Sequence, residues 1–224
     1  MLILLPVNAN NYRYGRLTWE RSTGRTITFM SETIWQSTFS GNEGIISLDF
    51  GDGSSNTSVG QVIASDSMYR RIRNQWTHTY SSDGPFNVSF TGSGRPTINN
   101  GGASLPYRIW ATVDLHFDDQ HSPTVDVPSA VLNWWRSSEG SPIRVDLPAI
   151  DIDSGNGIQC RLATAAESQI PSNPTAGANN LIVAANCTFE YDDLPLLPHF
   201  VDGSLMPRLL VIFMLFRSLS QPHD

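Results

Sequence analysis

Short runs of alternating apolar and polar residues that end in tight turns constrain the fold of this chain more than any other feature. Residues 46–50 (Ile-Ser-Leu-Asp-Phe) alternate in this way and stop at Gly51-Asp52-Gly53. Gly51 and Gly53 permit positive φ. The carboxylates of Asp49 and Asp52 are placed to accept hydrogen bonds from the amides of the turn. Strict alternation predicts strands with one face toward a core, and no helical period is sustained along the chain. We therefore predict an all-β protein.

Later runs in the first half keep the same alternation. The side chains of Trp76, His78 and Tyr80 alternate with threonines and share one face of a predicted strand. After a turn at Gly84, residues 86–91 alternate again. The other strands predicted here cover 12–19, 25–35, 61–65 and 107–115, with residues 54–60 and 92–104 as loops. This set of strands is sufficient to close one sandwich.

The turn and the two runs after it, taken in order, resemble the polycystic-kidney-disease (PKD) repeat, an immunoglobulin-like β-sandwich. The matching segments are Phe-Gly-Asp-Gly at 50–53, His-Thr-Tyr at 78–80, Gly84, and Phe-Asn-Val-Ser-Phe-Thr at 86–91. The resemblance implies that His78 is a packed, hydrogen-bonded strand residue and not a base. Two carboxylates beside a Gly turn also suggest a catalytic pair, but such carboxylates are far more often acceptors for turn amides. The structural residues of this turn are then Asp49, Gly51, Asp52, Gly53, His78 and Tyr80.

A polar, acidic segment that ends in Pro123 predicts a domain boundary at residues 117–123. We predict a PKD-like sandwich at 10–117 and a cadherin-like or immunoglobulin-like sandwich at 123–204, because 224 residues suit two tandem sandwiches of about 100 residues each. The strands expected in the second half cover 124–127, 131–135, 143–147, 158–162, 181–185 and 188–191. Residues 205–224 form an apolar tail or a last strand, too short and too interrupted by charge to cross a bilayer.

Residues 149–157 (Ala-Ile-Asp-Ile-Asp-Ser-Gly-Asn-Gly) resemble the Ala-x-Asp-x-Asp-Ser-Gly-x-Asn-Gly turn of cadherin repeats, with one residue fewer before Asn-Gly. In cadherins the matching Asp residues bind Ca²⁺ between repeats, and acids of the linker complete the shell. The resemblance implies a calcium site formed by Asp151, Asp153 and Asn156 together with Asp118 and Asp119. This linker lacks the Asp-x-Asn-Asp-Asn run of cadherins, so a turn whose carboxylates bind only backbone amides is the alternative. No other cofactor is expected.

His116, Asp118, Asp119 and His121 form the only compact cluster of metal-ligand residue types in the sequence. Either a transition-metal site or a solvated linker explains such a cluster, and we favour the linker. The sequence contains no Gly-x-Ser-x-Gly, His-Glu-x-x-His, Cys-x-x-Cys or Gly-rich phosphate loop. We therefore expect no enzymatic activity.

Several features agree with secretion. Cys160 and Cys187 cannot form a four-cysteine zinc site, and one disulfide is the simpler expectation outside the cell. Glycosylation triplets begin at Asn56, Asn87 and Asn186. Residues 1–9 resemble the end of a signal peptide but lack a basic region, so an exposed or strand-forming tail is the alternative.

The charge of the chain argues against nucleic-acid binding. The net charge is −7, all 14 basic residues are Arg, and the largest basic cluster is residues 70–73, which we expect on a solvated strand edge or loop. The sequence therefore predicts a non-catalytic adhesion or matrix module, secreted or at the cell surface, within a longer repeat protein. It would act as a spacer and as a binding surface for extracellular proteins or glycans. The alternative is an accessory domain pair of a larger secreted hydrolase, because PKD repeats also accompany proteases and glycoside hydrolases.

Overall fold

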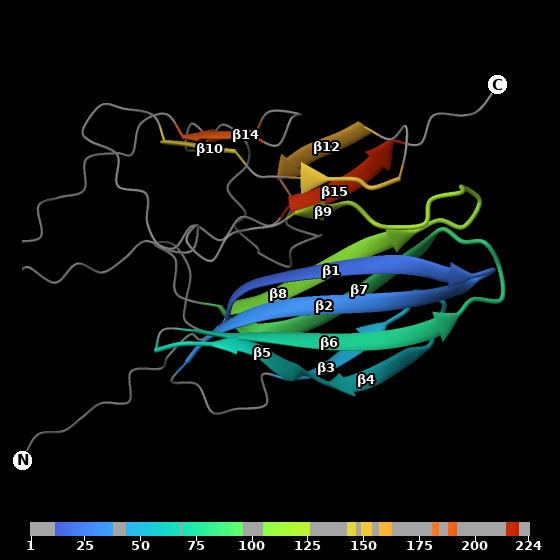
Figure 1. Cartoon of the computed structure of the whole chain (residues 1–224), viewed down its shortest axis with the longest axis horizontal. Helices are drawn as coiled ribbons and strands as arrows, with labels where there is room; N and C mark the ends of the chain where they lie inside the picture. The colour runs from blue at the N-terminus through green and yellow to red at the C-terminus, as the bar shows by residue number, and fades with distance from the viewer. Residues whose placement is uncertain are drawn as a thin grey trace, which may run out of the picture.

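A computed structural model of the chain describes residues 12–37, 44–67, 69–95, 105–125, 143–146, 149–153, 157–162, 181–183, 188–191 and 214–219. Within these ranges every regular element is a β-strand (Figure 1). The prediction of an all-β protein is confirmed. Among the described residues there is also no helix long and apolar enough to cross a membrane.

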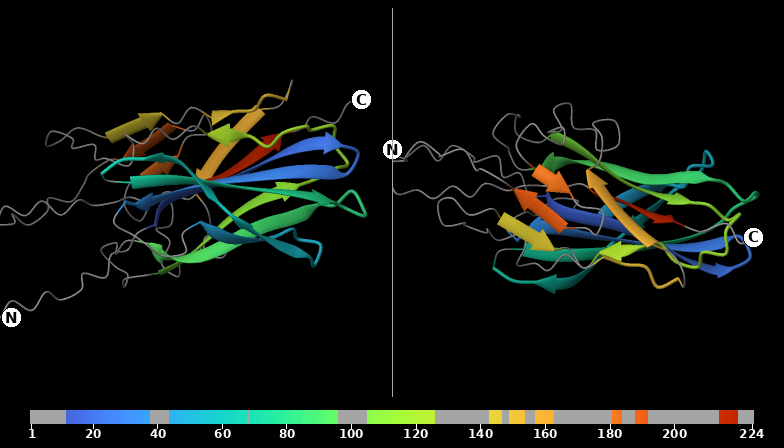
Figure 2. Two further views of the ribbon diagram at one scale, coloured as in Figure 1. Left: turned by 60° about the horizontal axis from the view of Figure 1, so that its bottom comes forward. Right: turned by 90° about the horizontal axis from the view of Figure 1, so that it is seen from above.

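The first half of the chain forms two antiparallel four-stranded sheets that face each other (Figures 1 and 2). The first sheet has the order β1-β2-β6-β5 and the second has the order β4-β3-β7-β8. The strands of the first sheet are β1 (Tyr12–Thr23), β2 (Thr26–Gln36), β6 (Tyr69–Thr79) and β5 (Gln61–Ser65). Those of the second sheet are β4 (Ser55–Val59), β3 (Ile45–Asp49), β7 (Phe86–Arg95) and β8 (Leu105–Val113).

The alternating apolar residues of both sheets meet in a single core. Ile27 and Phe29 of β2 are fully buried, as are Leu48 of β3 and Val88 of β7, while Trp76 of β6 is 4% exposed. Their polar neighbours along each strand face outward, which is the arrangement that a half-buried strand requires. The alternation along the chain therefore marks which face of each strand is the inner one.

Residues 54–60 were expected to form a loop, and this expectation is wrong. Residues 55–59 form β4, which pairs with β3 from Ile45 opposite Val59 to Asp49 opposite Ser55. Most of this edge strand is exposed, and its sequence shows no alternation of apolar and polar residues. The strand is recognised only by its backbone pairing with β3. The chain then passes from the second sheet to the first at Gly60, where an added Cβ would lie 2.5 Å from Asn74 Oδ1.

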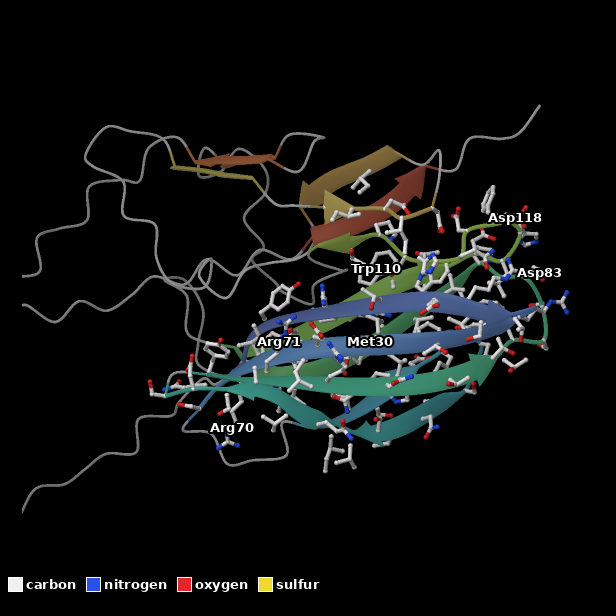
Figure 3. The ribbon with its side chains drawn as sticks, in the orientation of Figure 1. Met30, Arg70, Arg71, Asp83, Trp110 and Asp118 are labelled. Atoms are coloured by element: carbon white, nitrogen blue, oxygen red, sulfur yellow. The ribbon has the colours of Figure 1, made fainter. Side chains whose placement is uncertain are left out.

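Glu32 on β2 organises the outer face of the first sheet and is only 1% exposed. Its carboxylate accepts hydrogen bonds from Arg16 Nη2 at 2.7 Å, from Arg73 Nη2 at 2.6 Å and from Arg71, which is labelled in Figure 3. Burial alone would raise the pKa of Glu32, but the hydrogen bonds from Arg73 and Arg71 outweigh it and lower the pKa. The basic cluster at 70–73 thus lies in β6, between β2 and β5, and not on the solvated edge or loop that we expected.

The second half forms smaller sheets, which lie to one side of the first sandwich (Figures 1 and 2). The described strands are β9 (Thr124–Val125), β10 (Ile143–Asp146), β11 (Ala149–Ile150), β12 (Gly157–Leu162), β13 (Leu181–Val183), β14 (Thr188–Tyr191) and β15 (Met214–Leu219). They pair in the orders β10-β14-β13, β11-β9 and β12-β15, all antiparallel. The apolar stretch 205–224 therefore contributes one strand, β15, which pairs with β12.

Candidate binding face and the turns beside it

The Gly-Asp-Gly turn joins β3 to β4 and is held by its own carboxylates. Gly51 and Gly53 have φ values of 78° and 90°, which residues with a Cβ rarely adopt. Asp49 Oδ1 accepts a hydrogen bond from the Gly51 amide at 2.9 Å. Asp52 Oδ1 accepts from the amide of Ser54 at 3.0 Å and from its hydroxyl at 2.6 Å. Both carboxylates therefore serve the backbone of the turn.

His78 reaches this turn from β6, so it connects the first sheet to the second. Its Nε2 lies 2.7 Å from Asp52 Oδ2, and its ring stacks on Phe50 with the ring centroids 4.1 Å apart. The Tyr80 hydroxyl, two residues further along the chain, donates to the Phe50 carbonyl at 2.9 Å. Burial alone would raise the pKa of Asp52, but hydrogen bonds from Ser54 and His78 outweigh it and lower the pKa from 3.8 to about 2.

Ser54, Asp52 and His78 do not form the relay that a serine hydrolase needs. In that relay the base stands between the nucleophile and the carboxylate. Here the Ser54 hydroxyl donates to Asp52, so the carboxylate stands between the hydroxyl and the imidazole. The arrangement fastens a turn to a strand and leaves the hydroxyl without a general base.

Residues 117–122 of the predicted boundary segment 117–123 lie along the outer edge of β1. The Ser122 amide donates to the Trp19 carbonyl at 2.9 Å, and the Ser122 hydroxyl accepts from the Trp19 amide at 3.0 Å. The Arg21 amide donates to the Gln120 carbonyl at 2.7 Å. These bonds cover backbone groups of an edge strand that would otherwise be open to pairing with another chain.

Asp153, which follows β11, binds this same segment. Its Oδ2 accepts from the amides of Gln120 and His121 at 2.9 and 2.8 Å, and its Oδ1 lies 2.9 Å from His121 Nδ1. Burial alone would raise the pKa of Asp153, but the hydrogen bonds from His121 and Gln120 outweigh it and lower the pKa. Asp151 braces the turn itself, because its Oδ1 accepts from the Asp153 amide at 3.0 Å.

The described part of the chain contains no group of three or more His, Cys, Asp or Glu residues arranged to hold a metal ion. Within the cluster of residues 116–121, for which we favoured a linker over a transition-metal site, the two histidines have separate partners. His116 Nδ1 lies 2.8 Å from Asp114 Oδ1, and His121 binds Asp153. For calcium, Asn156 lies outside the described residues, and Asp118 and Asp119 are not brought into a three-residue group with the Asp residues of the turn. The calcium site stays a prediction.

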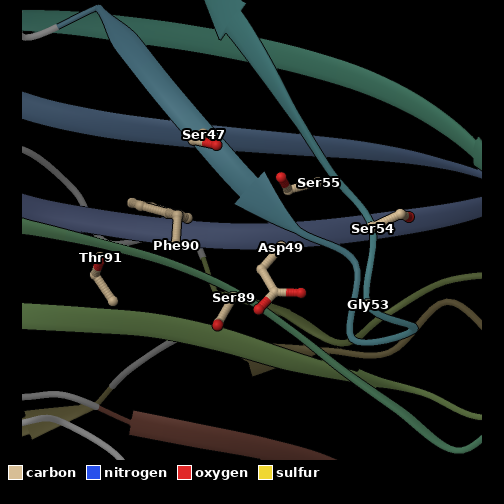
Figure 4. A pocket seen from close by; sticks show the side chains of 8 residues that line it. All are labelled: Ser47, Asp49, Gly53, Ser54, Ser55, Ser89, Phe90 and Thr91. Carbon is tan, nitrogen blue, oxygen red and sulfur yellow. The ribbon is translucent and has the colours of Figure 1, made fainter.

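A hollow of about 390 Å³ lies on the outer face of the second sheet (Figure 4). Five hydroxyls and one carboxylate line it, those of Ser47, Ser54, Ser55, Ser89, Thr91 and Asp49. The hollow was missed at the level of sequence. The outward positions of residues 46–50 and 86–91 are polar, and this is a usable signal, but only the pairing of Asp49 with Ser89 places the two runs side by side.

The predicted modification sites are only partly described. Asn56 Oδ1 accepts from the Thr57 amide at 2.8 Å, and Asn87 Oδ1 accepts from the Thr112 hydroxyl at 3.4 Å; both asparagines are exposed. Cys160 lies on β12 opposite Phe216. Cys187, Asn186 and residues 1–9 lie outside the described residues, so the disulfide, the third glycosylation site and the signal peptide stay predictions.

Comparisons of the chain with models of protein families, with curated proteins and with solved structures found no match.

Proposed function

We propose that this chain is a non-catalytic extracellular module of adhesion or matrix type, in which a PKD-like sandwich precedes a cadherin-like or immunoglobulin-like one. The observation that carries the proposal is the Phe50-Gly51-Asp52-Gly53 turn of the second sheet bound by His78 of the first. The residues that carry the sequence resemblance thereby occupy one packed structural unit. The lack of a nucleophile relay at this turn supports a structural role.

A spacer needs a defined geometry between its parts, and the boundary segment supplies a means of defining it. Residues 117–122 are hydrogen-bonded to β1 on one side and to Asp153 on the other. The segment is in this way hydrogen-bonded to both halves. This supports a role in which the module holds neighbouring domains at a set distance and orientation.

Function in such a scaffold is located on its surface, since the sandwich itself only presents faces and loops. The outer face of the second sheet offers a hollow lined by polar groups, and the exposed Asn56 and Asn87 are positioned for N-glycosylation. We expect partners among extracellular proteins or glycans.

Mass spectrometry of the natural protein after fractionation of the cells and their medium tests this proposal. We expect peptides of the chain in the medium or the surface-labelled fraction, with glycan on at least one predicted asparagine and with Cys160 and Cys187 protected from thiol labelling. We also expect them in a polypeptide that carries further sandwich repeats. Unmodified peptides found only inside the cell would refute the proposal, and a catalytic domain in the same polypeptide would favour the accessory region of a secreted hydrolase.

A further inference from the structure

We propose that the hollow on the outer face of the second sheet binds a neutral saccharide, with Trp110 as the surface on which a sugar ring stacks and Asp49 as the principal acceptor. This names the ligand class of the proposed binding surface and rests on that proposed function. The inference is built on the order of four strands and on the chemistry of the groups they align.

One row of outward-facing residues crosses all four strands of this sheet. Ser55 of β4 lies opposite Asp49 of β3, Asp49 lies opposite Ser89 of β7, and Ser89 lies opposite Trp110 of β8. Neighbouring strands are separated by about 4.8 Å, so the row spans roughly 14 Å. Directly opposed side chains have their Cβ atoms about 5 Å apart, which brings the indole next to the Ser89 hydroxyl.

Trp110 is on the same face as the hollow, as its neighbours on β8 show. Tyr107 and Ile109 point into the core and are 3% and 9% exposed. Arg108, by contrast, donates from Nη2 to the Ser89 hydroxyl at 3.1 Å, and Ser89 lines the hollow. Alternation along β8 therefore puts Trp110, which is partly exposed, on the face of Arg108. Trp110 is labelled in Figure 3.

Asp49 and Ser89, two of the polar groups of the hollow, are held by hydrogen bonds and keep hydrogen-bonding capacity for a ligand. Asp49 Oδ1 accepts from the Gly51 amide, whereas Oδ2 has no partner among the described residues. Figure 4 shows the Asp49 carboxylate extending from β3 towards Ser89. Ser89 is 5% exposed, and since its oxygen accepts from Arg108, its own hydroxyl proton is available. A carboxylate, fixed hydroxyls and an indole are thus combined on one face.

This combination fits a saccharide better than other classes of ligand. Sugar hydroxyls both donate and accept, so they satisfy the carboxylate and the serine hydroxyls together, and a pyranose with equatorial substituents presents a C–H face to an indole. An apolar ligand would leave these groups without partners. An anionic sugar would be repelled by Asp49 and by the net charge of −7, and the guanidinium of Arg108 on the same face would offset only a part of this repulsion. A peptide strand cannot add here, because β3 and β7 are both already paired on each side.

An ammonium ligand is the strongest competitor, because it would suit both a carboxylate and an indole face. It would, however, use only acceptors. Four hydroxyls of the hollow, those of Ser47, Ser55, Ser89 and Thr91, can donate to a ligand, whereas the Ser54 hydroxyl already donates to Asp52. These hydroxyl donors therefore favour a sugar over an ammonium ligand. Choline therefore serves as the probe for the competing class.

The test is a titration of the full chain, monitored by amide NMR shifts and by calorimetry. The chain is first freed of N-glycans, because Asn87 is on the same face of β7 as Ser89. The probes are cellohexaose and chitohexaose as neutral sugars, a galacturonate hexamer as an anionic one, and choline. We expect binding of at least one neutral sugar, with shifts concentrated on β3, β7 and β8. We expect Trp110→Ala to weaken binding about tenfold, which is what the loss of an aromatic contact amounts to.

Three further variants make the result specific. Asp49→Asn keeps an oxygen for the Gly51 amide but removes the charge, and we expect it to weaken binding by about tenfold as well. Trp110→Phe should restore part of the affinity. Met30→Ala truncates a residue on the outer face of the first sheet (Figure 3) and should leave affinity unchanged. Each variant is first compared with the parent chain by its melting temperature.

The inference is overturned if neither neutral sugar binds, if choline or the galacturonate binds in preference, or if Trp110→Ala and Asp49→Asn bind as the parent chain does. A folded, secreted and glycosylated chain that binds no sugar would overturn this inference alone. A chain confined to the cell interior would refute the proposed function, whatever the titration shows.

Discussion

Two turns, one in each half of the molecule, use the same pair of side chains for different purposes. Asp52 binds His78 at 2.7 Å, and Asp153 binds His121 at 2.9 Å. In both turns the carboxylate also accepts main-chain amides, and in both its pKa is lowered against the effect of burial. The first pair joins the two sheets of one sandwich, whereas the second joins the boundary segment to the turn after β11.

The two Asp–His pairs differ in the structure that surrounds them. His78 stacks on Phe50, which is 3% exposed, and it belongs to an eleven-residue strand in the middle of a sheet. Asp153 follows the two-residue strand β11, and the side chain of His121 is 31% exposed. The Asp52–His78 pair therefore stabilises packing at the edge of the core, whereas the Asp153–His121 pair positions the boundary segment. The effects of mutation should differ in size and in extent.

The largest effect is expected at Gly51, which lies between β3 and the aspartate of the first pair. A Cβ at this position would lie 2.7 Å from the Asn87 carbonyl oxygen, at a φ of +78°. We expect Gly51→Ala to cost about 3 kcal/mol of stability, from positive φ and from steric overlap together. Urea unfolding measures this loss.

Gly53→Ala is the matched control, because it has a similar φ but no heavy atom within 4 Å of the added Cβ. It should cost only about 1 kcal/mol, from the backbone conformation alone. Equal losses in the two variants would show that the approach of Asn87 to the turn is not as close as we describe.

Asp52→Asn should cost the first sandwich about 1.5 kcal/mol. A pKa lowered from 3.8 to about 2 corresponds to about 2.5 kcal/mol, and solvent screening at this exposed residue reduces that value. Native-state hydrogen exchange of the amides of β2 and β6 reports the free energy of opening this sandwich. Both strands should lose protection together, since His78 couples the sheets. A loss confined to the turn would mean that the pair does not fasten one sheet to the other.

The pH dependence of stability tests whether the charge of Asp52 causes this loss. Since the folded pKa of Asp52 is below its unfolded value, its contribution is fully present above about pH 3.8 and is lost as the pH falls through about 2. The stability difference between the parent chain and Asp52→Asn should therefore shrink steadily over this window. A difference that stayed constant down to pH 2 would assign the loss to packing and not to charge.

The smallest effect is expected for Asp153→Asn, at about 1 kcal/mol, because Asp153 binds a segment at the edge of the sandwich and not its core. The amides of Gln120 and His121 should exchange faster, because they lose their acceptor. The amides of β2 should keep their protection. If β2 also lost protection, the boundary segment would be a part of the first sandwich and not a connection beside it.

The sequence by itself determined the strands that alternate and the turn that has two glycines, because both are encoded by neighbouring residues. Leu48, Val88 and Trp76 are buried as their period of two requires. β4 was not predicted for the same reason, because an exposed polar edge strand has no alternation of apolar and polar residues. The cluster at 70–73 was misplaced because the charges can be read from adjacent residues, whereas Glu32, the partner of Arg71 and Arg73, is distant in the sequence.

Only the tertiary structure decided which distant groups meet. Asp49 faces Ser89 and Ser89 faces Trp110 because β3, β7 and β8 are neighbours in that order, and many strand orders are compatible with the same alternation. Asp153 meets His121 because the boundary segment lies along β1. Periodicity specifies which face a side chain occupies, but a contact between faces depends on the pairing of strands far apart in the chain.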